Sequence, residues 1–361
     1  MDNYREVELL PAKGVGASGT ETIDIAIDEP LTALYVYFYG INGAATADEV
    51  PPERCIDKIE IVDGGQVYWS TDGPEAVAAA VYETGKWPAH WYQETKDLDF
   101  HIHIPLLFGR YLGDEEFAFS PSRLLNPQLK VTWTRNALHT ATGYQLGVRA
   151  KAMQGVSAPS KALMVRNIRT YTATIAGIEP TDLPIDLDYR KLYVHAYAQR
   201  GYWQGVVTHF KLDCDVGKLI AFDMSAATLL AMIMENFPQV EVSHNMCLDD
   251  GVMKDTWLGT NLDAAVNSGN PDVFVNAWAQ SHGAVWQWSA NNDGASQNDE
   301  GVNARFFGFC PHHVMAYEFG RSQDPASWFK ASQYGQVRLQ MTGGTVGGSA
   351  SILLQRPTVL P

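Results

Sequence analysis

The chain contains 361 residues, of which 46% are hydrophobic and 19% are charged. This balance excludes an intrinsically disordered chain, and the length is sufficient for two domains that each bury a core. The formal net charge is −15 at pH 7 and no run of Lys or Arg occurs, which argues against direct binding of nucleic acid through its phosphates.

Residues 1–19 are polar and mixed, without the apolar stretch of a secretory signal, and we expect them to form an N-terminal arm. The longest apolar run, residues 226–234, is far shorter than the ~20 residues that cross a bilayer. Four cysteines are widely spread along the chain: Cys55, Cys214, Cys247 and Cys310. Because they form no CxxC pair and are too few for a disulfide scaffold, we expect reduced, buried thiols.

Apolar and polar residues alternate with period two along much of the chain, which predicts β-strands. The alternation is clearest at residues 22–27, 129–133 and 337–341 and is typical of half-buried strands. Residues 34–39 are apolar or aromatic on both faces, as in a strand that is covered on both sides. Frequent Gly and Pro residues divide the chain into short segments, which favours β-sandwiches or barrels over a parallel α/β sheet.

Two segments have the pattern of a helix. Residues 74–84 begin with Pro74, which suits the first turn, and are followed by Gly85, which can end the helix. Residues 225–237 begin with Ser225, a good N-cap, and precede a proline. Apolar residues occupy more than one face of the second segment, so we expect that helix to be buried.

Similar blocks recur in the same order in the two halves of the chain and predict an internal duplication. The paired blocks are residues 33–39 with 191–197, 58–61 with 218–221, 108–110 with 319–321, 128–132 with 336–340, and 144–150 with 350–355. The third pair is the identical tripeptide Phe108-Gly109-Arg110 and Phe319-Gly320-Arg321. The alternative interpretation is two unrelated β-domains of similar composition.

The offset between paired blocks increases by about 50 residues after the second pair, so the second copy should contain an insertion. We expect a first domain at residues 20–153, a linker at 154–160, and a second domain at 161–361 with the insertion at about 240–303. The linker contains Gly, Pro and two Ser and is too short for the domains to move freely.

The predicted insertion is rich in turn-forming residues yet contains four tryptophans: Trp257, Trp278, Trp286 and Trp288. Exposed tryptophans are costly in a monomer, and aromatic residues are enriched at interfaces, so we interpret them as an interface or outward tower loop. The alternative is that they pack onto the second domain.

Two tandem β-domains with one helix each, a short linker and one enlarged loop resemble the double jelly-roll major capsid proteins of tailless icosahedral bacteriophages, many of which contain a membrane. Residues 102–110, then 114, 124 and 128–133, are similar to a family stretch in which an apolar-Pro-Leu-x-Phe-Gly-Arg run ends a strand. Residues 59–65 are also similar. The resemblance implies a mainly β fold of two tandem eight-stranded antiparallel jelly rolls, each with a short helix.

The resemblance also implies a structural function. Three chains would form a pseudo-hexagonal homotrimeric capsomer that tiles an icosahedral virion shell assembled in the host cytoplasm. Its partners would be neighbouring capsomers, penton or minor capsid proteins, and an internal viral membrane, with no sequence-specific contact to nucleic acid. No cofactor and no catalytic residue is implied. Arg110 and Arg321 each follow a Gly at a strand end, and we expect a salt bridge or carbonyl cap that holds the loop.

Metal and enzyme motifs were weighed against this interpretation. His101 and His103 share one face of a predicted strand, as in metal-binding cupins, but no acidic residue follows at the spacing of that site. His312 and His313 would point to opposite faces of an extended strand. No hydrolase, zincin or P-loop motif occurs. Two alternatives to a capsid protein remain: a two-domain β-sandwich that binds carbohydrate or a receptor (a lectin or spike), and a cupin-like metal enzyme.

Overall fold

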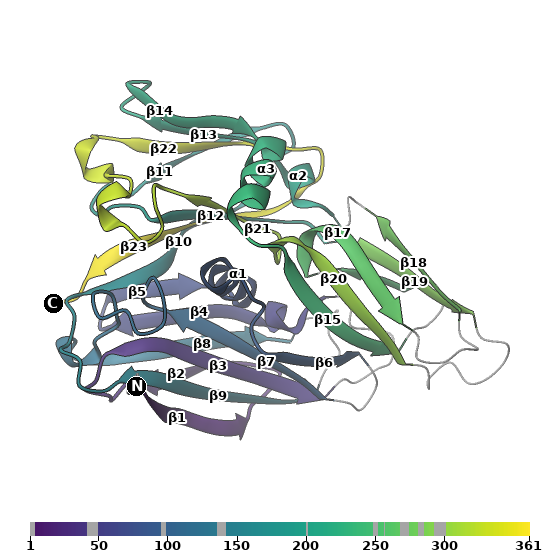
Figure 1. Cartoon of the computed structure of the whole chain (residues 1–361), viewed down its shortest axis with the longest axis horizontal. Coiled ribbons are helices and arrows are strands. Elements are labelled where there is room, and N and C mark those ends of the chain that lie inside the picture. Colours follow the sequence, from purple (N-terminus) through teal and green to yellow (C-terminus); the bar gives the residue numbers. More distant parts are fainter. Residues whose placement is uncertain are drawn as a thin grey trace.

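The computed structural model describes residues 4–41, 50–94, 99–135, 142–199, 201–247, 252–255, 257–267, 274–280, 285–291 and 301–361. Strands dominate the chain and form two eight-stranded antiparallel jelly rolls, as the resemblance implies. Figure 1 shows the first roll in purple and blue and the second roll in teal, green and yellow.

The first jelly roll consists of two facing sheets. One contains, in spatial order, β1 (Tyr4–Gly14), β9 (Thr142–Met153), β3 (Leu31–Ile41) and β7 (Asp99–Leu107), and continues into β6 (His90–Glu94). The other contains β2 (Ser18–Asp24), β8 (Pro127–Thr134), β4 (Ile56–Asp63) and β5 (Gln66–Thr71).

The second jelly roll repeats this order. Its first sheet contains β10 (Lys161–Ala173), β23 (Gly348–Val359), β12 (Lys191–Tyr197) and β21 (Val314–Glu318). Its second sheet contains β11 (Ile178–Leu183), β22 (Val337–Gly343), β13 (Val207–Cys214) and β14 (Leu219–Ser225). Each strand has a counterpart at the same place in the chain order and in the sheet, which is the arrangement that an internal duplication predicts.

Two expectations are corrected by this correspondence. Residues 4–14, expected to belong to an arm at 1–19, form strand β1, which pairs with β9 and is the counterpart of β10. Most residues of β1 are at least partly exposed because β1 is an edge strand. Its sequence is therefore polar, as that of an unpaired arm would be. Residues 58–61 lie in β4, whose counterpart is β13, whereas residues 219–221 lie in β14, the counterpart of β5.

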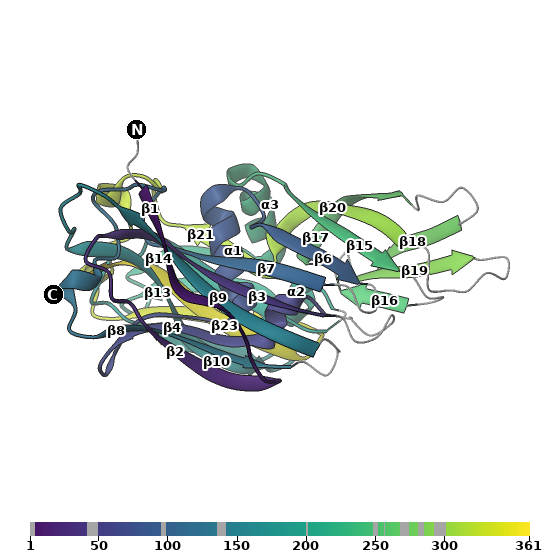
Figure 2. The ribbon, with the colours of Figure 1, turned by 90° about the horizontal axis from the view of Figure 1, so that it is seen from below.

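The insertion in the second roll is built of strands. They are β15 (Val240–Cys247), β16 (Val252–Asp255), β17 (Leu258–Asn267), β18 (Phe274–Gln280), β19 (Val285–Asn291) and β20 (Gly301–Pro311). Strands β15, β20 and β17 extend the first roll's sheet through a parallel pairing of β15 with β6, and β16, β19 and β18 form a separate sheet. This separate sheet lies at the end of the molecule opposite both termini (Figures 1 and 2).

The two predicted helices are α1 (Gly73–Thr84) and α3 (Ala226–Asn236). Asp72 and Glu75 form a capping box at the start of α1, Gly85 ends it with φ 68°, and Ser225 caps α3. Nearly all of α1 is buried, whereas α3 buries one face only, so the expectation of a buried second helix is wrong. One short α-helix and four 3₁₀ turns complete the described elements: α2 (Trp203–Val206), η1 (Pro52–Cys55), η2 (Pro121–Arg123), η4 (Pro325–Ser327) and η5 (Ala331–Gln333).

A single continuous apolar core runs through both rolls. Leu34, Val36 and Phe38 of β3 are fully buried, while the tyrosines between them are only half-buried, so one face of β3 is covered more completely than the other. Cys55, Cys214 and Cys310 are buried thiols, and the side chain of Cys247 lies outside the described residues. None of the described helices has the length and apolar character needed to span a membrane.

Candidate functional site

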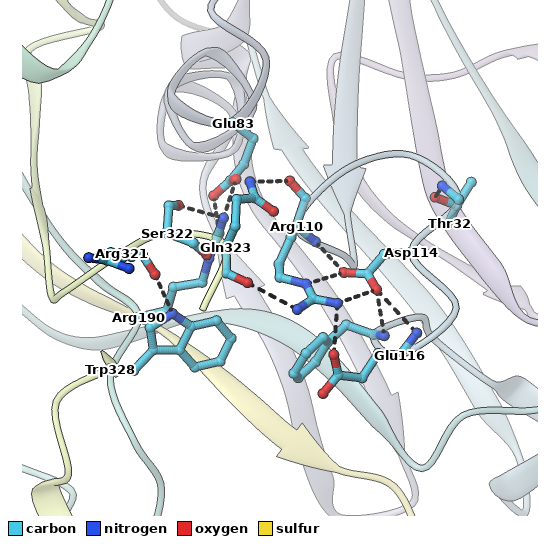
Figure 3. Close-up of polar contacts among 12 residues, drawn as sticks. Thr32, Glu83, Arg110, Asp114, Glu116, Arg190, Arg321, Ser322, Gln323 and Trp328 are labelled. Carbon is cyan, nitrogen blue, oxygen red and sulfur yellow. Dashed lines mark hydrogen bonds and ion pairs between the residues drawn. The ribbon is translucent and has the colours of Figure 1, made fainter. Parts of the chain in front are cut away.

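The surface between the two jelly rolls carries a dense set of polar and aromatic contacts. Strand β5 of the first roll pairs in parallel with β10 of the second at Ser70 and Arg166, so one sheet of eight strands crosses the boundary. Arg110, Arg321 and Glu83 of helix α1 lie close together at this boundary (Figure 3). The candidate site is therefore the contact region between the two jelly rolls.

The phenylalanine and glycine of each tripeptide have clear packing roles. Phe108 packs against Trp69 and Phe119, with ring centroids 6.0 and 5.2 Å away. A Cβ on Gly109 would stand 2.7 Å from Asp114 Cβ, and one on Gly320 would stand 2.2 Å from the carbonyl oxygen of Ser327. Gly320 also has φ 72°, a conformation that disfavours other residues. Both loops therefore require glycine at this position.

Arg110 holds its own loop closed (Figure 3). Its Nε and Nη2 atoms donate to the two carboxylate oxygens of Asp114 at 2.7 and 2.9 Å, and Nη2 also lies 2.8 Å from Glu116. Burial would raise the pKa of Asp114, but the hydrogen bonds from Arg110 outweigh it and lower that pKa. A bidentate pair of this kind fixes the loop geometry.

Arg321, in the equivalent position, is bonded through its backbone. Its N–H donates to Ser327 Oγ at 2.8 Å, and its carbonyl accepts from Trp328 Nε1 at 3.1 Å. The Arg321 side chain is exposed. The two identical tripeptides thus end their strands in the same way but close their loops with different contacts.

The two tripeptide loops touch each other across the boundary. Arg110 Nη1 donates to the carbonyl of Gln323 at 3.1 Å, and Gln323 Nε2 donates to the carbonyl of Arg110 at 3.4 Å (Figure 3). Beneath them, the rings of Phe117 and Trp328 lie 5.6 Å apart in a small apolar cluster with Leu163. These contacts link residues more than 200 positions apart.

A buried ion-pair network, which sequence reasoning missed, lies beside these loops. Glu83 at the end of α1 accepts hydrogen bonds from Arg190 and from Lys191, and all three side chains are at most 6% exposed. Burial would raise the pKa of Glu83, but Lys191 and Arg190 together lower it to about 2. The signal in the sequence was an Arg-Lys pair directly before a strongly apolar strand.

A second polar cluster lies at the other end of α1. Asp72 and Glu75 of the capping box face His195 on β12, whose Nδ1 lies 3.7 and 3.5 Å from their carboxylates. Burial raises the pKa of Asp72 to about 7 and lowers the pKa of His195 to about 4. Sequence reasoning identified the helix start but not the histidine, because the two segments are about 120 residues apart.

Of the four tryptophans in the insertion, Trp257 is 2% exposed. Its ring packs against Trp87 at 5.7 Å and His244 at 4.5 Å. Trp278 lies on β18, and Trp286 and Trp288 lie on β19, but their side chains are outside the described part of the structure. Trp257 therefore packs within the chain.

The histidine pairs noted in the sequence stack on aromatic rings or lie in a turn. His101 stacks on Tyr39 with ring centroids 4.9 Å apart, and His103 packs edge-on against Tyr37 at 4.7 Å. His312 and His313 have φ 48° and 65° in the turn between β20 and β21, so the expectation of an extended segment is wrong. Both are buried.

No protein-family model and no curated protein matches the chain. Solved structures do match it in fold. The major capsid protein P2 from bacteriophage PM2 is 12% identical with a TM-score of 0.56, over 99% of this chain and 98% of that chain. A chain of Sulfolobus Turreted Icosahedral Virus is 11% identical with a TM-score of 0.61, over 99% and 91%. A chain of the PBCV-1 virus capsid is 10% identical with a TM-score of 0.57, over 99% and 94%. The chain thus has the double jelly-roll fold of these proteins.

Proposed function

We propose that this double jelly-roll chain is a major capsid protein that forms pseudo-hexagonal homotrimers in an icosahedral virion shell. The fold matches of nearly full length to viral capsid chains support this function. A structural role also agrees with a candidate site made of ion pairs and packing contacts between domains.

The main support for a trimer is that the two rolls have equivalent edge strands. Within the chain, β5 of the first roll meets β10 of the second. Their counterparts are β14 and β1, and each ends a sheet in the described structure. A second copy can therefore repeat the same junction by placing its β1 beside β14. Six rolls joined in this way form a closed ring of three chains in which the β1 and β14 edges are paired.

Side chains near this edge support the same contact. Leu219 and Ile220 on β14 are 40% and 45% exposed. The outer face of α3 carries Met234, also 40% exposed, whereas the counterpart helix α1 is covered by strands of the second roll. A neighbouring copy would cover α3 and β14 as the second roll covers α1 and β5. Apolar surface that is left open in one copy is a feature of interfaces.

The remaining expectations follow from the same proposal. The sheet of β16, β19 and β18, far from both termini, would be a tower or a clamp between subunits (Figure 2). Partners would be neighbouring capsomers, penton or minor capsid proteins and an internal membrane, and the protein would be located in the virion after assembly in the host cytoplasm. The domains would be the two rolls joined at residues 154–160. The proposed role involves no catalysis.

Light scattering coupled to size exclusion tests the proposal. We expect a mass of about 119 kDa, three times the 39.8 kDa of the chain. Ile220→Asp should shift the protein toward the monomer, because it puts a charge on the proposed contact edge. Leu125→Asp is the matched control, since Leu125 is 98% exposed on the first roll away from that edge. A wild-type protein that stays monomeric at high concentration would overturn the trimer.

The alternative of a lectin or spike is not favoured, since Trp257 packs inside the chain instead of lining an open groove. Saturable glycan binding by a monomer would be the result that supports it.

A further inference from the structure

The polar cluster of Asp72, Glu75 and His195 lies where the two jelly rolls meet. Asp72 and Glu75 stand at the start of α1 in the first roll, and His195 lies on β12 in the second. Glu75 and His195 are 2% and 4% exposed. Their facing atoms, together with a carboxylate oxygen of Asp72, all lie within 4.8 Å of one another.

The capping box uses only one oxygen of each carboxylate. Asp72 Oδ1 accepts from the Glu75 N–H at 2.7 Å, and Glu75 Oε2 accepts from the Asp72 N–H at 2.9 Å. The second oxygens, Asp72 Oδ2 and Glu75 Oε1, are the atoms 3.7 and 3.5 Å from His195 Nδ1. The helix cap thus holds two carboxylate oxygens in fixed positions opposite an imidazole nitrogen.

His195 is buried, and its two ring nitrogens are not both hydrogen-bonded. Among the described residues, His195 Nε2 has no hydrogen-bond partner, and Nδ1 faces the two carboxylate oxygens.

Charge balance also favours a cation. The Glu75 carboxylate is buried and that of Asp72 is 30% exposed, and Arg54, whose guanidinium lies 3.2 Å from the centroid of the Tyr197 ring, is a positive group that acts on both. One guanidinium offsets only one of the two carboxylates when both are ionised. A divalent cation would offset the remaining negative charge.

The spacing of the three atoms suits a small transition-metal ion. Bonds of about 2.0–2.2 Å to nitrogen and carboxylate oxygen in a tetrahedral site place the ligand atoms roughly 3.4 Å apart. The two distances from Nδ1, 3.5 and 3.7 Å, are close to that value. A polar cavity of about 390 Å³ adjoins Asp72 and Glu75 and has room for a water molecule as fourth ligand.

Neighbouring residues would hold the ligands in place. Asn167 Nδ2 lies 3.5 Å from Glu75 Oε1 and donates to Thr170 Oγ1 at 2.9 Å, and Thr170 bonds Ser351 at 3.0 Å. Supporting hydrogen bonds to ligating carboxylates are typical of metal sites in proteins.

We propose that Asp72, Glu75 and His195 form a binding site for a divalent first-row transition cation, with Zn²⁺ as the best match to one nitrogen and two carboxylate ligands. Such an ion would join helix α1 of the first roll to strand β12 of the second. Binding would stabilise the folded chain and fix the relative position of the two rolls.

Isothermal titration of chelator-treated full-length protein with ZnCl₂ tests the site. We expect one Zn²⁺ per chain and a rise in melting temperature on binding. Asp72→Asn and Glu75→Gln each keep an acceptor for the capping box but remove the ligand charge, and each should weaken binding at least tenfold. His195→Gln should do the same. His101→Gln, an exposed histidine on β7, is the control and should bind as wild type.

Replacement of Zn²⁺ by Co²⁺ adds a readout of geometry, since a tetrahedral site with nitrogen and oxygen ligands gives intense visible absorption. We expect this absorption in wild type and its loss in Asp72→Asn. The proposal is overturned if wild type takes up no stoichiometric ion, or if Asp72→Asn, Glu75→Gln and His195→Gln all bind Zn²⁺ as tightly as wild type does. Because the two carboxylate variants preserve the helix cap, they remain informative if the histidine variant does not fold.

Discussion

Arg190, at the start of β12 in the second jelly roll, donates from both terminal nitrogens to the carboxylate of Glu83, at the end of α1 in the first roll. The Arg190 side chain is fully buried and that of Glu83 is 6% exposed (Figure 3). Lys191 donates to the same carboxylate at 2.9 Å. Arg190, Lys191 and Glu83 thus form one buried network across the two rolls, and Lys191 also pairs with Glu318 at 3.1 Å.

Replacing Glu83 by Gln should strongly destabilise the protein. The substitution removes the counter-charge of Arg190 and leaves Lys191 with Glu318 alone, 3.1 Å away, and removing one partner of a buried ion pair costs about 3–5 kcal/mol. Urea unfolding at pH 7 measures the loss. Asp182→Asn, in the exposed pair with Arg338, is the control and should change stability little. Equal effects of the two substitutions would contradict the network.

The same network predicts the acid limit of stability. Lys191 and Arg190 lower the pKa of Glu83 from its usual 4.5 to about 2 in the folded protein. A depressed carboxyl pKa contributes stability that is complete above the unfolded value and is lost as pH falls through the folded value. Wild type should therefore lose stability between about pH 4.5 and 2. Glu83→Gln should lack this part of the pH dependence in thermal unfolding measured across that range.

Glu53 should have the opposite effect on pH dependence. It is 1% exposed, and burial raises its pKa to about 8. A raised pKa contributes stability that is complete below the unfolded value of 4.5 and is lost as pH rises through 8. Glu53→Gln should therefore raise the melting temperature relative to wild type at pH 9 more than at pH 5. An equal difference at both pH values would show that Glu53 is not buried in its protonated form.

The glycines of the two Phe-Gly-Arg tripeptides should resist substitution. Gly320→Ala places a Cβ against the Ser327 carbonyl at a residue with φ 72°, and Gly109→Ala places one against Asp114 and Phe117. We expect each to cost about 1–3 kcal/mol in denaturant unfolding. Gly65→Ala is the control, because a Cβ there meets nothing within 4 Å. Unchanged stability in Gly320→Ala would contradict the loop geometry.

Trp257→Ala tests whether the Trp257 side chain packs within the chain or at an interface between subunits. If Trp257 packs within the chain as its 2% exposure indicates, the substitution should destabilise the monomer by about 3–5 kcal/mol. Trp91→Ala, at a residue that is 53% exposed, should have a much smaller effect on unfolding. Normal stability of Trp257→Ala with loss of the 119 kDa species would instead assign Trp257 to a subunit interface.

Local patterns in the sequence were sufficient for the elements that depend on neighbouring residues. Alternating residues 129–133 and 337–341 lie in the equivalent strands β8 and β22, and Pro74 and Ser225 correctly indicated the helix starts. These strands and helix starts follow from local information, because half-buried strands and helix caps are set within a few residues of the chain. The identical tripeptides marked equivalent strand ends for the same reason.

The pairing of these strands and the contacts between distant segments depend on packing in three dimensions. Strand β1 is an edge strand whose polar sequence acquires its role from pairing with β9, more than 100 residues later, and β15 joins the first roll through β6. The contacts of Glu83 with Arg190, and of Asp72 and Glu75 with His195, likewise join distant segments. Such contacts leave no periodicity in the sequence, since they are selected by packing in three dimensions. Local sequence patterns therefore specify the strands and helices of this protein, whereas the contacts between the two jelly rolls arise from the packing of the whole chain.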